Sequence, residues 1–314
     1  MVRFGIQLCQ EEFSLDGLRK ASREVEGMGY DSAWLYDHFY PMSRQTSEYI
    51  LESWTVLPSL ASETTRLRLG VLVTCNSYRF PSVLAKIAAT VDTMSGGRLE
   101  FGIGAGWYED EYRAYGIPFP DVKTRIEQLA ESVEIIKRIW TSEKASFQGK
   151  HYFVKDLVSY PKPVQKPYPP IWVGGKNEGL LQITAQHADY ANFASCSVDE
   201  YQNKLDVLRG QCSKVGRNFG QIEKTWHGRV VIVDKKEKLK REALKVKESS
   251  TNKEVQKLSL TEYLDKVIAG TPEQCVQRIQ KYVDIGVTYF IPHFPFAKDS
   301  RAPQVFMDRV ASAI

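Results

Sequence analysis

The sequence predicts an α/β fold, a (β/α)8 TIM barrel with extended loops after strands 2 and 7 and before strand 5. Three observations support this: strand-like and helix-like segments alternate, eight strand-like segments occur, and 314 residues suit one barrel with long loops. Strict alternation is typical of a parallel sheet. Eight units favour closure, although periodicity alone does not separate a barrel from an open sheet. We expect residues 1–314 to form a single domain.

The first βα unit is the clearest. Apolar residues at positions 4, 6 and 8 alternate with others, which indicates a strand. Ser14 is a typical N-cap for a helix with apolar side chains at helical spacing over 15–28, and Gly29 is placed to end it. The remaining strands are expected near Ser32–Tyr36, Leu67–Leu72, Leu99–Ile103, Ile171–Val173, Tyr190–Phe193, Gly228–Val233 and Tyr289–Pro292.

Three connecting segments are longer than a minimal barrel needs, so we interpret them as candidate lids. They cover residues 37–52, 142–169 and 234–260. In the last segment Leu239, Ala243 and Val246 share one helical face, with lysines elsewhere. Such a helix is usually a solvated surface helix, and the alternative is a contact for an anionic coenzyme tail.

Composition favours a cytoplasmic protein with a small-molecule partner. A net charge of +4, scattered along the chain, gives no nucleic-acid surface. No apolar run approaches a membrane span, and the start has no signal-peptide pattern. Five widely spaced cysteines without a CxxC pair argue against both a disulfide framework and a zinc site.

The pair Asp37–His38 follows the second strand. In a barrel the active site lies at the carboxyl ends of the strands, and an imidazole there can act as a general acid or base near neutral pH. An Asp-His pair by itself is more often a surface feature. Its place after a strand favours His38 as a catalytic residue, with Asp37 either orienting it or serving the structure.

Glycines follow the fourth strand in the segment Gly102-Ile103-Gly104-Ala105-Gly106-Trp107. Glycines at 104 and 106 let backbone amides approach a flat ring or an anion closely. The spacing is GxGxG and no apolar-periodic helix follows directly, so a Rossmann dinucleotide site is excluded. The alternative is a tight turn without a ligand.

A second glycine loop, Gly174-Gly175-Lys176, follows the fifth strand and leads into a helix. Free amides and the positive end of a helix favour a phosphate, and Lys176 adds charge. Barrels usually bind phosphate after strands 7 and 8, so this position needs a family-specific reason.

Other constellations are absent from the sequence. His151, His187, His227 and His293 have no metal-ligand spacing to a partner, so we expect no metal site. The chain has no Walker loop and no GxSxG elbow.

Three segments together resemble the luciferase-like monooxygenase superfamily, and in particular its F420-dependent oxidoreductases, over nearly the full length. The first contains Leu69-Gly70-Val71-Leu72-Val73-Thr74 and LAKIAATVDTMSGGRLEFGIGAGW. The second is PPIWVGGKNEGLLQITAQHADYAN from Pro169, and the third is GTPEQCVQRIQKYVDIGVTYFI from Gly270. Asp37–His38 falls where the F420-using branch carries an Asp-His pair.

This resemblance implies that coenzyme F420 lies at the mouth of the barrel and that hydride passes between the deazaflavin and a small organic substrate. His38 would handle the proton, with Asp37 beside it. The resemblance further implies a homodimer and a non-proline cis peptide at Leu72–Val73 against which the coenzyme ring rests. The residues expected to bind the coenzyme are Leu72, Val73, Thr74, Gly104, Ala105, Gly106, Gly174, Gly175 and Lys176.

This chain departs from the resembling family at one residue, and two alternative functions remain open. The branch that oxidises a sugar phosphate has a glutamate where this chain has Trp107, which puts that substrate in doubt. An FMN-dependent monooxygenase is the first alternative, but its arginine and histidine near strand 7 have no clear match, because His227 and Arg229 fall out of register. A flavin-binding barrel without catalytic activity is the second.

Overall fold

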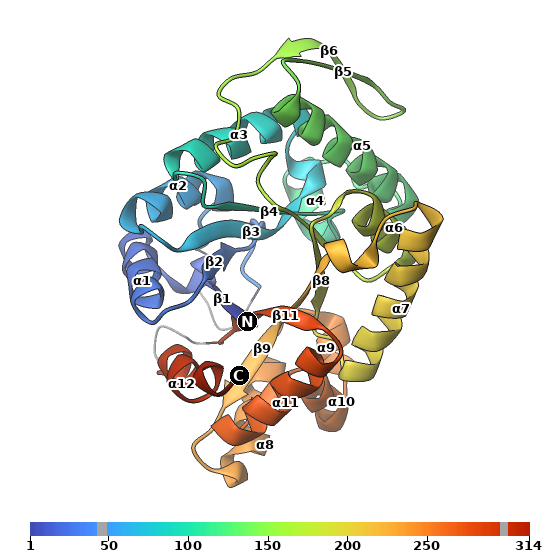
Figure 1. Ribbon diagram of the computed structural model, residues 1–314. Coiled ribbons are helices and arrows are strands. Elements are labelled where there is room, and N and C mark those ends of the chain that lie inside the picture. Colours follow the sequence, from blue (N-terminus) through green and yellow to red (C-terminus); the bar gives the residue numbers. More distant parts are fainter. Residues whose placement is uncertain (43–48, 296–300) are drawn as a thin grey trace.

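The computed structural model describes residues 1–42, 49–295 and 301–314. Its centre is a closed barrel of parallel strands surrounded by helices (Figure 1). Going around the barrel, the strands are β1 (Arg3–Gln7), β2 (Ser32–Leu35), β3 (Arg68–Cys75), β4 (Leu99–Gly104), β7 (Ile171–Gly174), β8 (Tyr190–Ala194), β9 (Glu223–Ile232) and β11 (Val287–His293), which pairs again with β1.

Helices connect successive strands and cover the outside of the barrel (Figure 1). Ser14 caps the first of them as expected, because its side chain accepts a hydrogen bond from the amide of Gly17. The helices are α1 (Leu15–Gly27), α2 (Ser53–Glu63), α3 (Pro81–Met94), α4 (Glu109–Ala114), α5 (Val122–Thr141), α6 (Glu178–His187), α7 (Val198–Lys214), α8 (Leu239–Glu248), α9 (Lys253–Lys257), α10 (Leu260–Asp265), α11 (Pro272–Asp284) and α12 (Ala302–Arg309).

The predicted barrel is confirmed, but several strand boundaries differ. β3 continues to Cys75 rather than ending at Leu72, and the largest difference is in the seventh barrel strand. The seventh barrel strand was expected from Gly228, but β9 begins at Glu223. Its first residues are polar because they lie near the foot of the barrel, where Glu223 pairs with Arg3, so no apolar run marks the start. A short strand, β10 (Ile268–Gly270), pairs with the far end of β9.

Large aromatic side chains close the foot of the barrel. Trp34, Trp172 and Tyr289 are fully buried and pack edge to face, with ring centroids 4.5 Å apart for the two tryptophans and 5.3 Å apart for Trp172 and Tyr289. Gly70 is required beside them, because a Cβ there would lie 2.6 Å from the Trp34 ring. The filled interior leaves only the opposite end of the barrel, at the carboxyl ends of the strands, for a ligand.

The three long segments have different structures. Residues 142–169 contain an antiparallel hairpin of β5 (Lys144–Gln148) and β6 (Phe153–Val158) at the edge of the molecule (Figure 1). Residues 234–260 contain α8 and α9, which pack with α10 around a hydrophobic cluster separate from the main core. Part of the segment 37–52 lies outside the described residues.

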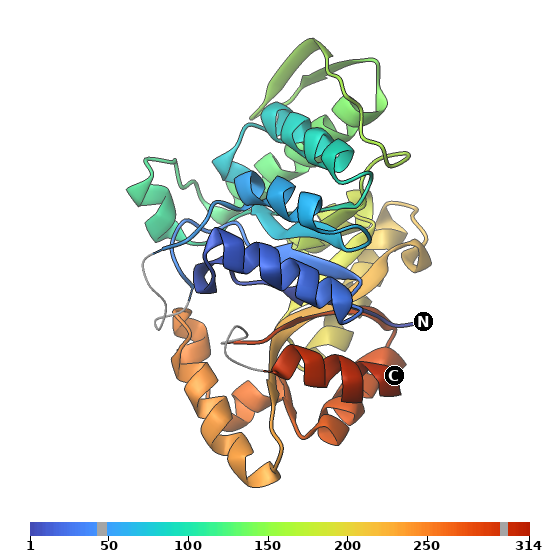
Figure 2. The same ribbon diagram turned by 90° about the vertical axis from the view of Figure 1, so that its left-hand side faces the viewer.

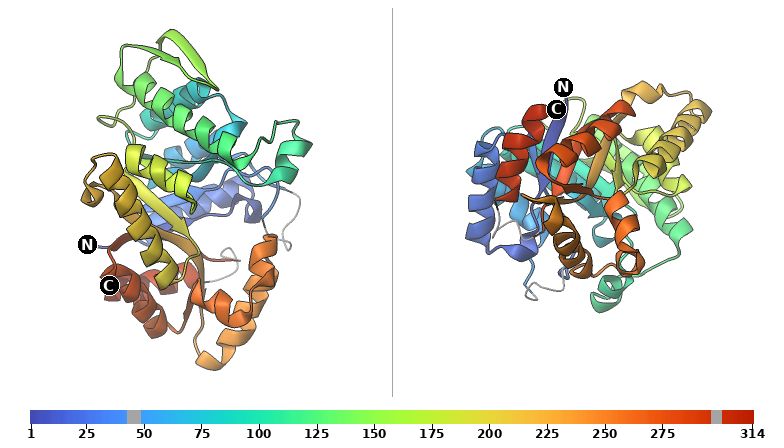
Figure 3. Two further views of the ribbon diagram at one scale, coloured as in Figure 1. Left: turned by 90° about the vertical axis from the view of Figure 1, so that its right-hand side faces the viewer. Right: turned by 90° about the horizontal axis from the view of Figure 1, so that it is seen from below.

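The two ends of the barrel differ. Figures 2 and 3 show α4 and α8 projecting from one end, whereas both termini lie at the other. In the described part of the chain, no helix combines the length and apolar character needed to span a membrane.

Candidate functional site

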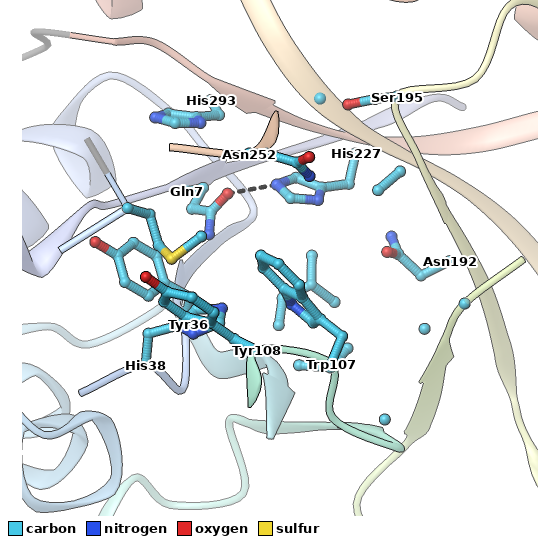
Figure 4. A pocket seen from close by; sticks show the side chains of 18 of the residues that line it. Gln7, Tyr36, His38, Trp107, Tyr108, Asn192, Ser195, His227, Asn252 and His293 are labelled. Carbon is cyan, nitrogen blue, oxygen red and sulfur yellow. Dashed lines mark hydrogen bonds between the residues drawn. The ribbon is translucent and has the colours of Figure 1, made fainter. Parts of the chain in front are cut away.

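A cavity of about 920 Å³ opens at the carboxyl ends of the barrel strands (Figure 4). Its walls come from the loops after the strands and from the segment 249–258. None of the described residues of 142–169 lines it, so the expectation of a lid there is wrong. The hairpin lies outside the barrel, beside α5, and cannot reach the mouth.

The cavity walls include every residue predicted for the site, namely Asp37, His38, Leu72, Val73, Thr74, Gly104, Ala105, Gly106, Gly174, Gly175 and Lys176.

His38 lies at the mouth with its side chain 16% exposed. Its Nδ1 atom is 2.9 Å from Oε2 of Glu111 in α4. The ring packs edge to face against Trp107, with centroids 5.6 Å apart, and Trp107 stacks on Tyr108 (Figure 4). The imidazole is therefore held from one side by a carboxylate and from another by an aromatic wall.

Asp37 is bound on all sides by donors from neighbouring segments. Its two oxygens accept hydrogen bonds from both terminal nitrogens of Arg79, at 2.7 and 2.9 Å. They also accept from the hydroxyl of Ser53 and from the amide of Cys75, both at 2.9 Å. These contacts tie β3 and α2 to the loop that carries His38. They give Asp37 a structural role, which is one of the two roles expected for it.

Strand β3 carries the irregularity expected from the resemblance. The peptide bond Leu72–Val73 is cis, and the register of β3 with β4 shifts between Val71 and Thr74. Val73 projects toward the neighbouring strands, because a Cβ on Gly104 would lie 2.7 Å from one of its methyl groups and a Cβ on Gly174 would lie 2.9 Å from the other. The glycines of both predicted loops therefore make room for Val73.

The loop at 174–176 leads into α6 as predicted. Gly175 has a φ of +144°, and a Cβ there would lie 2.1 Å from Leu180, so this position excludes side chains for packing reasons alone. Asn177 caps α6 by accepting from the amide of Leu180. The Nζ atom of Lys176 is 3.5 Å from the carbonyl oxygen of Ser195, which brings its charge to the rim of the cavity.

Three residues that the sequence analysis set aside also line the cavity. His227 faces inward from β9, and His293 at the end of β11 lies on the same side of the cavity (Figure 4). Arg229 of β9 also lines the cavity. The side chains of His227 and Gln7 share a hydrogen bond. Burial lowers the pKa of His227 to about 4, so its imidazole is neutral at pH 7. The signal that was missed is the register of strand 7. It was hidden because the strand was predicted to start too late.

Among the described residues, one group of side chains is of the type that could bind a metal ion. It consists of Cys9, Glu12 and His293. Their ligand atoms all lie within 4.8 Å of one another. The Sγ atom of Cys9 and Nε2 of His293 are 3.0 Å apart. Burial raises the pKa of the Cys9 thiol, and burial and the charge of Arg229 lower the pKa of His293. We interpret the two as a neutral hydrogen-bonded pair beside a cation.

Comparison with known proteins gives a consistent picture. The family model described as "Luciferase-like monooxygenase" matches residues 1–289. An F420-dependent glucose-6-phosphate dehydrogenase from Kineococcus radiotolerans is 28% identical over 96% of this chain and 93% of its own length.

Solved structures show the same fold. An F420-dependent secondary alcohol dehydrogenase in complex with an F420–acetone adduct superimposes with a TM-score of 0.87 at 17% identity, covering 100% of this chain and 99% of that one. The F420-dependent tetrahydromethanopterin reductase from Methanopyrus kandleri has a TM-score of 0.83 at 18% identity, covering 99% of each chain.

Proposed function

The chain belongs to the luciferase-like monooxygenase family, and we propose that it is a coenzyme F420-dependent oxidoreductase acting on a small organic alcohol or carbonyl compound. The observation that carries the proposal is the convergence of His38, the register shift of β3 between Val71 and Thr74 and the loop at 174–176 on one cavity. The relatives over the full length that depend on F420 support the choice of coenzyme.

The cavity suits a flat tricyclic ring with a phosphate-bearing side chain. A volume of about 920 Å³ lies in the upper range for ligand sites. Val73 packs against Gly104 and Gly174, and none of the three offers a polar side chain to a ring face. Lys176, in the loop just before α6, offers a positive charge beside the N-terminus of that helix to a phosphate.

The chemistry that F420 supplies when bound is the acceptance or donation of a hydride. The protein then has to handle one proton at the substrate oxygen, and His38 is placed for it. When an alcohol is oxidised, its O–H proton passes to the imidazole as the C–H electron pair leaves with the hydride. In the reverse direction the imidazolium returns that proton to the carbonyl oxygen.

Trp107 indicates a substrate with an apolar face. The indole is 51% exposed although it lines the cavity, and it stacks on Tyr108 with centroids 5.2 Å apart. The flat apolar face of a tryptophan at the mouth of a cavity suits packing against an apolar part of a substrate. We therefore propose an apolar alcohol or ketone in preference to glucose 6-phosphate, the substrate named for the relatives.

The experiment that tests the proposal is a fluorescence titration with F420 and FMN in parallel, followed by turnover with a panel of secondary alcohols and aldehydes. Tight binding of F420 with turnover supports it. Tighter binding of FMN, with oxygen-dependent turnover, would assign the chain to the monooxygenase alternative. Binding without turnover for any substrate would favour a barrel that only binds the coenzyme. The His38→Ala variant should bind F420 as the wild type does and turn over roughly 100-fold more slowly.

We also propose a homodimer. Phe80 and Val83 at the start of α3 are 73% and 52% exposed, and Tyr160, held to α3 by Lys86, is 56% exposed. An apolar surface of this kind is typical of an association site, and two-fold dimers are the commonest arrangement. Light scattering should give twice the mass of 35.8 kDa, and Phe80→Asp should give the monomer mass.

A cytoplasmic location is part of the proposal. All five cysteines are free and buried. Free thiols are the normal state in a reducing compartment. Fractionation of cells that produce the protein, followed by immunodetection, tests it.

A further inference from the structure

Glu111 makes several contacts around His38 whose role in the proposed reaction is not explained above. It lies in α4 with its side chain fully buried. Its Oε1 atom accepts from the amides of Phe39, at 2.7 Å, and Tyr40, at 2.9 Å. Its Oε2 atom accepts from the hydroxyl of Tyr78, at 2.6 Å, and lies 2.9 Å from Nδ1 of His38. One carboxylate thus holds both the ring of His38 and the backbone that follows it.

The ionisation of Glu111 decides which nitrogen of His38 carries the proton. Burial alone would raise the pKa of Glu111, but the hydrogen bond with His38, its charge, the Tyr78 hydroxyl and the Tyr40 amide outweigh burial and lower it. An ionised carboxylate only accepts hydrogen bonds. The Nδ1 atom of His38 must therefore carry a hydrogen, which leaves the lone pair of the neutral ring on Nε2.

We propose that Glu111 is a positioning residue that fixes His38 in the Nδ1–H tautomer and directs Nε2 toward the substrate oxygen. The inference rests on the proposed function for the role of His38, whereas the tautomer itself follows from the contacts of Glu111. Trp107 supports the arrangement, because its edge-to-face contact restricts rotation of the imidazole. A carboxylate behind a histidine performs the same task in other enzymes that use the imidazole as a base.

The first test reads the tautomer directly and needs no coenzyme. Protein labelled with 15N-histidine is studied by NMR above pH 8, and His38→Ala identifies the His38 signals. The wild type should show a protonated Nδ1 and a bare Nε2. In Glu111→Gln the amide can donate to Nδ1, so the population should shift toward the Nε2–H form. A wild-type spectrum with the Nε2–H form would overturn the proposal, even if the variant fails to fold.

The second test is a double-mutant cycle on turnover. Glu111→Gln alone should lower kcat roughly 10-fold or more, with the Kd for F420 unchanged. In a His38→Ala background the same change should alter kcat by less than about 2-fold, because a residue that acts through His38 has nothing left to position. Equal losses in both backgrounds would show that Glu111 serves only the structure.

The matched control is Glu109→Gln. Glu109 lies in the same helix but is exposed and pairs with Arg113. Its replacement should leave both the histidine spectrum and kcat unchanged, and a loss equal to that of Glu111→Gln would overturn the assignment. If the chain uses FMN instead of F420, turnover with F420 disappears in every variant while the NMR result stands, so the two failures are distinguishable.

Discussion

Replacing Asp37 with asparagine separates a structural role from a catalytic one. The wild-type carboxylate is 1% exposed and neutralises Arg79, whose side chain is 13% exposed. An asparagine has one acceptor oxygen, and its NH2 group would face the donors that bind the second carboxylate oxygen in the wild type. If the oxygen stays with Cys75 and one nitrogen of Arg79, the amide can still donate to Ser53 but opposes the second nitrogen of Arg79. At least one charge-assisted hydrogen bond and the buried ion pair are lost.

The size of the effect follows from these contacts. Removing one partner of a buried ion pair costs about 3–5 kcal/mol. Arg79 keeps a second partner in Glu52, which reduces the cost to about 3 kcal/mol or somewhat less. An unfolding entropy of about 2.1 cal/mol/K per residue gives roughly 0.66 kcal/mol/K for 314 residues, so Tm should fall by about 4–5 °C.

Differential scanning fluorimetry without ligand measures this shift. The control is Asp206→Asn, because Asp206 is 54% exposed and its partners among the described residues, Gln202 and Arg209, are close neighbours on α7. Its Tm should change by less than about 1 °C. An unchanged Tm for Asp37→Asn, together with a large loss of kcat, would refute the structural role and make Asp37 a catalytic group.

Three further predictions concern the walls of the cavity. Lys176→Met should weaken F420 binding roughly 3- to 10-fold in a fluorescence titration, and unchanged affinity would remove the phosphate site from this loop. Trp107→Ala should raise KM for an apolar alcohol roughly 5-fold while the Kd for F420 stays constant, and equal KM values would contradict a substrate contact. Gly106→Ala should destabilise the protein by about 1–3 kcal/mol, since its φ is +76° and a Cβ would lie 1.9 Å from the Tyr112 hydroxyl. Gly27→Ala, with no atom within 4 Å, should be neutral or stabilising in the same denaturant titration.

The barrel could be predicted because its strands and helices differ in period along the chain. Strands such as Leu99–Ile103 carry large apolar side chains at alternate positions, and helices such as 126–140 repeat at helical spacing. The hairpin of β5 and β6 was not predicted. Most of its residues are exposed or half-buried, so no apolar pattern marks its strands.

The glycine loops and His38 could be predicted because they follow recognisable strands. Glu111 could not, since its partner His38 is 73 positions away and only the packing of α4 brings them together. His227 was missed for a related reason. Polar residues that face into a barrel mouth interrupt the apolar pattern by which strands are recognised, so a strand that carries them is placed late or short.

The small hydrophobic cluster of α8 and α10 has a consequence for how this protein can diverge. The cluster contains Ala243, Val246, Tyr263 and Val267, which pack with one another rather than with the main core. The cavity wall at 249–258 is attached to this cluster. Selection can therefore remodel that wall of the cavity while the barrel strands and the loops that carry His38 and the glycines stay the same. Exchanging residues 234–267 with those of a relative that has another substrate tests whether this wall takes part in the choice of substrate.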